Sequence, residues 1–285
     1  MGYIQVNKIE KPTPEEFKER FIKNPKPVII KDFAADWEAV NKWTFDYFKD
    51  KYGDWDVPLY DDTYHRAGKG YMKPIMHRKF SEYLEIIQKE PTNLRFHNFQ
   101  VMQRAPELAN DYKKPDLMKG FMKFALMFFG GEGSKLNLHY DIDCSHVFLT
   151  HFQTEKKVYL FPPSESTYLY HLPYTNHAHL DVLNPDWKKY PAFKYARGYE
   201  ATINHGETLF IPKLWWHYVY YSKGGYSLAL RANDSLNTKI RGAYNLVRLF
   251  TIDNTINFLL KDTWKQWKYS IAQQRANQVI KTIKT

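Results

Sequence analysis

The pattern of apolar and polar positions in the first part of the chain alternates between helix-like and strand-like stretches. In TPEEFKERF, Thr13 can cap a helix that begins at Pro14, and Glu16 can complete a capping box. Phe17 and Phe21 would then lie on one face of this helix. The same reading of spacing and end signals predicts a buried strand in NPKPVIIKDF and two more helices, in WTFDYFKDKYGD and KFSEYLEIIQKE.

From about residue 121 the apolar positions follow the period of strands, in short runs separated by glycine and proline. FMKFALMFFGGEGS reads as a strand that ends in a glycine loop, and HVFLTHFQTEKKVYLFPP as one or two strands. Turns at His205-Gly206, Pro212-Lys213 and Gly224-Gly225 divide the stretch from YEATINHG to YSLALRA into four more. We therefore predict a mainly β fold with flanking helices, built on a double-stranded β-helix (jelly-roll) core.

The last fifty residues return to a helical period. Five apolar side chains recur at three- and four-residue steps and predict one continuous face: Ile256, Leu260, Trp264, Trp267 and Ile271. Such a face can pack back on the chain's own sheet or form a subunit interface. The patterns divide the chain into an N-terminal helix and strand segment (1–120), a barrel core (121–235) and a C-terminal helical region (236–285).

Composition and charge narrow the class of protein. Of 285 residues, 44% are hydrophobic and 25% charged, which is typical of a globular domain, and the 17% of aromatic residues favours a β-rich core. The net charge of +10 favours an acidic partner, although scattered lysines on a solvated surface give the same number. The single cysteine, Cys144, excludes a disulfide framework and a cysteine-based zinc site.

Two further observations concern location. The N-terminal stretch MGYIQVNKIEKPTPEE lacks the apolar core of a secretory signal, and the longest apolar run, 124–129, is far too short to cross a bilayer. Together with the lone cysteine, they lead us to expect a cytoplasmic protein without membrane association.

The stretch NLHYDID carries the first candidate chemistry. On a strand, His139 and Asp141 would project to the same side, and Asp143 would join them if the strand continued that far. A non-haem Fe(II) site needs two imidazoles and one carboxylate on one face, with positions left open. His217, at the head of the strand after the turn in GETLFIPKLWWHYVYY, can supply the second imidazole. Zinc accepts similar ligands, but this donor set among aromatic residues favours iron.

A second histidine and carboxylate pair serves as a comparison. His179 and Asp181 have the same spacing but lie in a stretch rich in proline and asparagine, with the turn signal NPD. A loop does not fix two side chains to one side as a strand does, so we prefer the first pair. The remaining histidines considered are expected to be surface residues or satisfied core residues: His146, His151, His171 and His205.

Several ordered motifs carry a resemblance to a known family. GGEGSKLNLHYD, KKVYLFPP, LNPDWKKYPAF, YEATINHGETLFIPKLWWHYV and GGYSLALRAND follow one another as in the JmjC-type, cupin-like Fe(II)/2-oxoglutarate oxygenases. The chain also resembles, over roughly residues 8 to 235, the group that contains the asparaginyl hydroxylase inhibiting hypoxia-inducible factor. The terminal helices are similar to that family's dimerisation region, which implies a homodimer through the C-terminal helices.

The resemblance implies roles for particular residues. It makes His139, Asp141 and His217 the ligands of Fe(II), and it places Lys156, on the strand before LFPP, against the far carboxylate of the cosubstrate 2-oxoglutarate. Lys157 is the neighbour that could serve instead.

The chain also departs from the family pattern. Leu136 and Asn137 stand where the family usually has Thr-Pro, and Phe96 is the nearest match to a tyrosine that touches 2-oxoglutarate, so two hydroxyl contacts are missing. We hypothesise that Arg231 holds a cosubstrate carboxylate in compensation; the alternative is an outward-facing arginine at a strand end.

The expected function is hydroxylation of a protein or peptide side chain by an Fe(II)- and 2-oxoglutarate-dependent dioxygenase. A nucleic-acid hydroxylase is the second enzyme hypothesis, because a tRNA-modifying relative shares this fold and the positive charge suits an anionic partner. The third is a non-catalytic, metal-binding cupin that has lost the cosubstrate, which the changes at Leu136 and Phe96 would favour.

Overall fold

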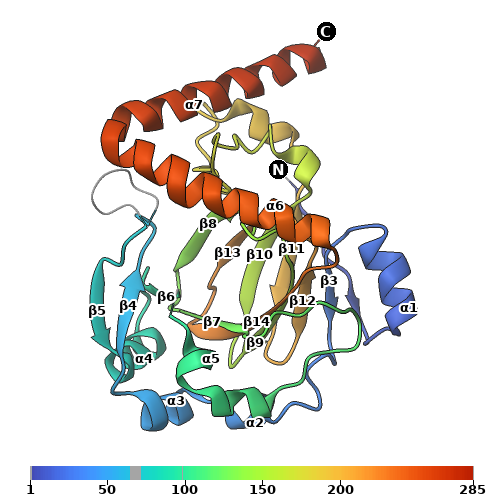
Figure 1. Cartoon of the computed structure of the whole chain (residues 1–285), viewed down its shortest axis with the longest axis vertical. Coiled ribbons are helices and arrows are strands. Elements are labelled where there is room, and N and C mark those ends of the chain that lie inside the picture. Colours follow the sequence, from blue (N-terminus) through green and yellow to red (C-terminus); the bar gives the residue numbers. More distant parts are fainter. Residues whose placement is uncertain (1, 65–71, 98, 285) are drawn as a thin grey trace.

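The computed structural model describes residues 2–64, 72–97 and 99–284 and contains two facing β-sheets (Figure 1). Eight consecutive strands are divided between a five-stranded sheet, ordered β1-β11-β10-β13-β8, and a nine-stranded sheet, ordered β2-β3-β12-β9-β14-β7-β6-β4-β5. The eight are β7 (Leu126–Gly130), β8 (Lys135–His139), β9 (His146–Phe152), β10 (Lys156–Phe161), β11 (Tyr199–Ile203), β12 (Thr208–Ile211), β13 (Trp216–Tyr220) and β14 (Gly225–Ala232). The predicted jelly roll is confirmed, and HVFLTHFQTEKKVYLFPP forms two strands.

The N-terminal segment extends both sheets. Its strands are β1 (Ile4–Gln5), β2 (Lys8–Ile9), β3 (Val28–Ile30), β4 (Asp56–Tyr60), β5 (Met76–Lys79) and β6 (Arg95–Phe96). β1 pairs with β11, β3 pairs with β12, and β6 pairs with β7, so earlier parts of the chain cover the edges of the barrel sheets at β11, β12 and β7. Pairing with β7 brings β6 to the barrel, which matters for the site below.

Short helices cover the outer face of the nine-stranded sheet. They are α1 (Pro14–Phe17), η1 (Lys18–Ile22), α2 (Glu38–Lys42), α3 (Phe45–Tyr52), α4 (Phe80–Lys89), α5 (Val101–Arg104) and η2 (Pro106–Asp111); η3 (Pro163–Glu165) and η4 (Pro191–Tyr195) lie later in the chain. The capping box of Thr13 and Glu16 is present as predicted. Phe17 lies 4.8 Å from Phe210, ring centre to ring centre, so the predicted apolar face packs on the sheet.

Alternation along the strands separates the core from the barrel interior. On β9, Phe148 and Phe152 belong to the outer cluster under the helices, while Val147 and Leu149 point inward. The other barrel strands follow the same period of two, and the five-stranded sheet buries Trp216 against the loop between β10 and β11. Residues two apart on one strand therefore share access to the interior.

The C-terminal region comprises α6 (Leu236–Val247), η5 (Arg248–Asp253) and α7 (Asn254–Lys284). These helices cross above the strands in the view of Figure 1, and the chain reverses where Lys261 has φ 43° and ψ −117°. The predicted continuous face from Ile256 to Ile271 is therefore wrong: Leu260 and Trp267 are 52% and 42% exposed. No glycine or proline in the sequence signals this break.

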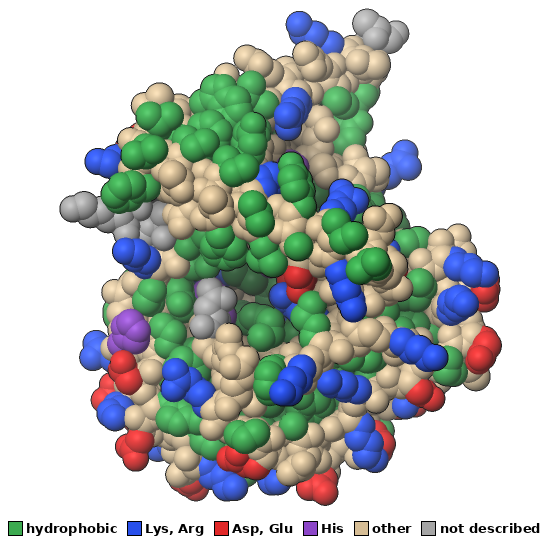
Figure 2. Space-filling model, in the orientation of Figure 1, with side chains coloured by type: hydrophobic (Ala, Val, Ile, Leu, Met, Phe, Trp, Pro, Cys, Tyr) green, Lys and Arg blue, Asp and Glu red, His purple; other side chains and the backbone are tan. Residues whose placement is uncertain are grey.

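Beyond the break, α7 packs on the rest of the chain through Ala272 and Ala276. Packing on the chain's own sheet is one of the two alternatives predicted for the terminal helix. Hydrophobic side chains also gather on the solvent side of these helices (Figure 2). In the ranges that the structure describes, no helix is both long enough and apolar enough to span a membrane.

Candidate metal centre

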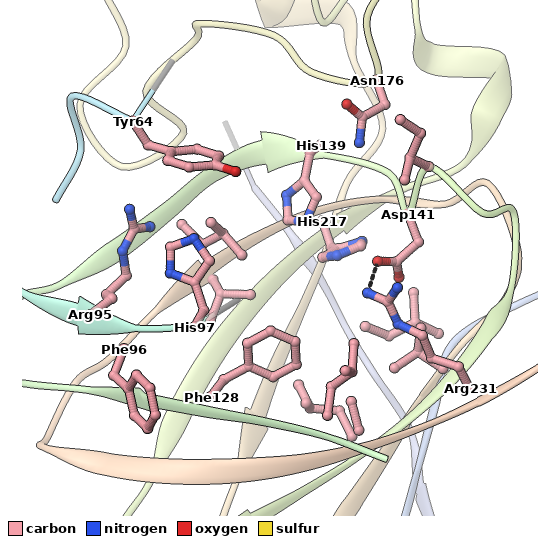
Figure 3. A pocket seen from close by; sticks show the side chains of 18 of the residues that line it. Tyr64, Arg95, Phe96, His97, Phe128, His139, Asp141, Asn176, His217 and Arg231 are labelled. Atoms are coloured by element: carbon pink, nitrogen blue, oxygen red, sulfur yellow. Dashed lines mark hydrogen bonds and ion pairs between the residues drawn. The ribbon is translucent and has the colours of Figure 1, made fainter. Parts of the chain in front are cut away.

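Three side chains predicted as metal ligands lie together inside the barrel (Figure 3). One potential ligand atom from each of His139, Asp141 and His217 lies within 4.8 Å of the others. His139 ends β8 and is paired with His217 on β13, and the centres of their rings are 4.2 Å apart. Pairing of neighbouring antiparallel strands thus brings together two residues far apart in sequence.

Asp141 is positioned by a turn rather than by the strand. β8 ends at His139, so the expectation that Asp141 lies on the strand is wrong, and the condition on which Asp143 would join it is not met. Asn176 holds the intervening Tyr140 by two hydrogen bonds: the Asn176 carbonyl accepts from the Tyr140 N–H at 3.0 Å, and its Nδ2 donates to the Tyr140 carbonyl at 2.7 Å. From α6, Asn245 Nδ2 donates to the Ile142 carbonyl at 3.3 Å.

The two imidazoles are held in the tautomer that a metal needs. Nδ1 of His139 lies 2.7 Å from the Asn137 carbonyl, and Nδ1 of His217 lies 3.1 Å from the Trp215 carbonyl. Since a carbonyl only accepts, each Nδ1 carries the proton and each Nε2 keeps a free lone pair. Both ligand nitrogens are therefore prepared for coordination.

Burial sets the charge of these groups. Burial and the neighbouring His217 lower the pKa of His139 to about 3, and burial also lowers the pKa of His217, so both rings are neutral at physiological pH. Burial by itself raises the pKa of Asp141, but the positive charge of Arg231 opposes this effect. The pKa is lowered overall, so the carboxylate stays ionised. Two neutral imidazoles and one anion match the donor set of a ferrous site.

Arg231 points into the barrel, not outward. Its guanidinium forms ion pairs with Asp141 and, at 3.2 Å, with Asp143. The arginine therefore supports the acidic turn. Its hypothesised contact with a cosubstrate carboxylate remains a prediction.

A cavity of about 250 Å³ opens beside the three residues. Apolar side chains such as Phe128 and Leu149 make most of its wall, and Leu249 and Phe250 of η5 stand at its edge. Lys156 also lines it, whereas Lys157 points to the other face of β10 and pairs with Glu200 at 3.4 Å. Of the two lysines considered, only Lys156 reaches the cavity.

β6 and the residue that follows it contribute two polar side chains that the sequence analysis missed. Arg95, Phe96 and His97 all line the cavity, and Phe96 also packs with Phe129 in the outer core. That Phe96 is the nearest match to the family tyrosine remains a prediction. Alternation in the short run Arg-Phe-His is the signal that could have identified them.

The comparison pair does not join the metal centre. Asp181 pairs with Lys135 at 2.5 Å and accepts from the Tyr218 hydroxyl at 3.0 Å, and His179 contacts the Tyr269 hydroxyl. Other histidines have core partners as expected; for example, Nδ1 of His151 lies 3.0 Å from the Ser227 hydroxyl.

The chain is similar to several known proteins. The chain is 27% identical over 246 residues to tRNA wybutosine-synthesizing protein 5 of Homo sapiens, which covers 78% of this chain and 76% of that protein. It is 28% identical over 241 residues to JmjC domain-containing protein D of Dictyostelium discoideum, covering 73% and 52%. It is 26% identical over 223 residues to lysine-specific demethylase 8 of Xenopus tropicalis, covering 75% and 49%. Residues 14–238 match the cupin-like domain, and the chain therefore belongs to the cupin-like (JmjC-type) domain family.

Proposed function

We propose that the protein is an Fe(II)- and 2-oxoglutarate-dependent dioxygenase that hydroxylates a C–H bond of a macromolecule. The observation that carries this proposal is the set of two neutral imidazoles and one carboxylate, facing a cavity that contains a buried lysine. A purely structural metal site would be closed by a fourth protein ligand. Among the residues that the structure describes, only His139, Asp141 and His217 form such a group.

Each part of the site has a defined task in this proposal. His139, Asp141 and His217 would hold the ferrous ion, and Lys156 would bind the far carboxylate of 2-oxoglutarate. The bound metal and cosubstrate together supply the oxidising power for hydroxylation. The apolar wall around Phe128 and Leu149 limits water near the reacting atoms, and η5 borders the space that the substrate enters.

Two classes of substrate are considered. Hydroxylation of a protein side chain is the expectation from the resemblance to the asparaginyl hydroxylase group. A tRNA substrate is supported by a different observation: a relative named as a tRNA-modifying protein matches over most of both chains. The net charge of +10 also favours an anionic partner.

Turnover with candidate substrates tests this function. We expect the protein with Fe(II) and 2-oxoglutarate to form succinate faster when tRNA or a substrate peptide is added. His139→Ala removes a proposed ligand and should abolish the reaction, whereas His179→Ala changes a comparable buried histidine outside the site and should retain it. Succinate formation that is equal in both variants would contradict the assignment of the site.

We also propose that the protein forms a homodimer through its C-terminal helices. Apolar side chains recur at three- and four-residue steps along α6 and are each more than half exposed: Leu236, Ile240, Tyr244 and Val247. Phe250, Phe258 and Leu259 extend this surface along η5 and α7. A contiguous apolar surface of this kind is costly to leave in water, so a second copy would cover it.

A further inference from the structure

One end of the cavity contains two buried cations. Lys156 and Arg95 are 1% and 4% exposed. No carboxylate of the described residues lies within 4.0 Å of either charge; Asp61 and Asp62 influence Arg95 only from farther away. Burying a charge without a counter-ion is costly, so this end of the cavity favours an anion.

Tyr221 connects the two cations. The Lys156 Nζ lies 4.0 Å from the centre of the Tyr221 ring. The ring lies over Gly130, where a Cβ would come within 2.6 Å of ring atoms Cε2 and Cζ, and Gly130 is paired with Arg95 across β7 and β6. Glycine at this position makes room for the ring, and Tyr221 and Arg95 are close enough to interact electrostatically. All three side chains line the cavity.

The hydrogen bonds of Arg95 use only two of its five N–H donors. Its two terminal nitrogens donate to the backbone carbonyls of Lys135 and, at 2.6 Å, Asp61. Its Nε is buried and has no hydrogen-bond partner in the described parts of the chain. Arg231 is different, because carboxylates already occupy its terminal nitrogens.

We propose that Arg95 and Tyr221 complete the cosubstrate site by binding, together with Lys156, the far carboxylate of 2-oxoglutarate. This inference rests on the proposed dioxygenase function and extends it to residues outside the family pattern. A carboxylate at this end would neutralise the excess positive charge and accept a hydrogen bond from the Nε–H of Arg95. Such contacts would replace those lost where this chain has Leu136 and Phe96.

The test measures cosubstrate binding instead of activity. Calorimetric titration of the protein loaded with Mn(II), which does not turn over, would compare 2-oxoglutarate with 2-oxobutyrate, which has a hydrogen atom in place of the far carboxylate. Arg95→Met should weaken 2-oxoglutarate binding about 10- to 100-fold, the value expected for a charge-assisted hydrogen bond. Binding of 2-oxobutyrate should remain unchanged.

Further variants separate this role from a structural one. Tyr221→Phe keeps the ring and should weaken 2-oxoglutarate binding about 2- to 10-fold. Arg95→Lys keeps the charge and can be used if the methionine variant does not fold. It should give an intermediate loss of 2-oxoglutarate affinity. Arg78→Met, on the exposed surface of β5, is the matched control and should bind like the unchanged protein.

Two results would overturn the inference while leaving the dioxygenase proposal intact. One is a dissociation constant for 2-oxoglutarate that is the same in the Arg95 and Arg78 variants. The other is an equal loss for both oxoacids, which would indicate a general structural role for Arg95. If the unchanged protein binds 2-oxoglutarate no better than 2-oxobutyrate, the proposed function itself fails along with the inference.

Discussion

Replacing Lys156 by methionine should make the protein more stable in the absence of 2-oxoglutarate. The same change should remove the stabilisation that 2-oxoglutarate gives on binding. The Lys156 Nζ has one hydrogen-bond partner among the described residues, the Ser227 hydroxyl at 2.5 Å. An ammonium has three donors, so two are unmatched inside the protein. Methionine keeps the unbranched shape without the charge, and Ser227 retains its contact with His151.

The size of the effect follows from these contacts. Each of the two buried donors without a partner costs about 1–3 kcal/mol, and the contacts with the Tyr221 ring and Ser227 together offset about 2–3 kcal/mol. We therefore expect Lys156→Met to raise the free energy of unfolding by about 1–2 kcal/mol, or the Tm by about 2–6 °C. In the unchanged protein, cosubstrate at about 100 times its Kd adds about 2.7 kcal/mol, and the variant should lose this gain.

Thermal unfolding with and without 2-oxoglutarate, in the presence of Mn(II), measures both effects. Lys157→Met is the control, because Lys157 lies on the opposite face of β10 and should change stability by less than about 0.5 kcal/mol. A lower Tm for Lys156→Met without cosubstrate would refute the view that Lys156 is an unmatched buried charge. An undiminished rise in Tm on adding cosubstrate would refute its role in binding.

Three further predictions concern pH, metal binding and assembly. Burial lowers the pKa of Lys156 well below its ordinary value of 10.5, so the unfolded chain binds more protons than the folded one between the two pKa values. The unchanged protein should therefore gain stability relative to Lys156→Met as pH rises toward 10.5. Unfolding in urea measures this, and a difference in unfolding free energy that stays constant with pH would contradict the reasoning. His139→Ala should reduce Mn(II) affinity in calorimetry by about 100-fold or more, whereas His179→Ala should not. Introducing aspartate at both Ile240 and Tyr244 should convert a dimer to a monomer in light scattering; a monomeric unchanged protein would contradict the assembly.

Much of the barrel could be predicted because its strands and turns are marked by short local patterns in the sequence. Alternating apolar residues and glycine or proline turns mark the strands, and the capping box of Thr13 and Glu16 marks a helix start. His139 and His217 could be chosen because each belongs to a strand with a clear pattern, and adjacent strands of a jelly roll bring such residues together.

The missed features depend on contacts between distant segments. The strand that carries Arg95 has only two residues, and its access to the cavity depends on pairing with β7, far along the chain. Asp141 faces His139 because Asn176 holds the turn after β8, which no local pattern reveals. The reversal at Lys261 is likewise absent from the local pattern, because a helical period alone predicts a straight helix.

The chelate of Fe(II) with 2-oxoglutarate gives the most direct measurement of the metal site. Under anaerobic conditions, addition of both to the purified protein should produce the weak visible charge-transfer band of this chelate, and His139→Ala should not produce it. If the unchanged protein binds iron but shows no band at saturating 2-oxoglutarate, the cavity does not present the cosubstrate to the metal. That result would contradict the dioxygenase proposal and favour a metal-binding cupin without this chemistry.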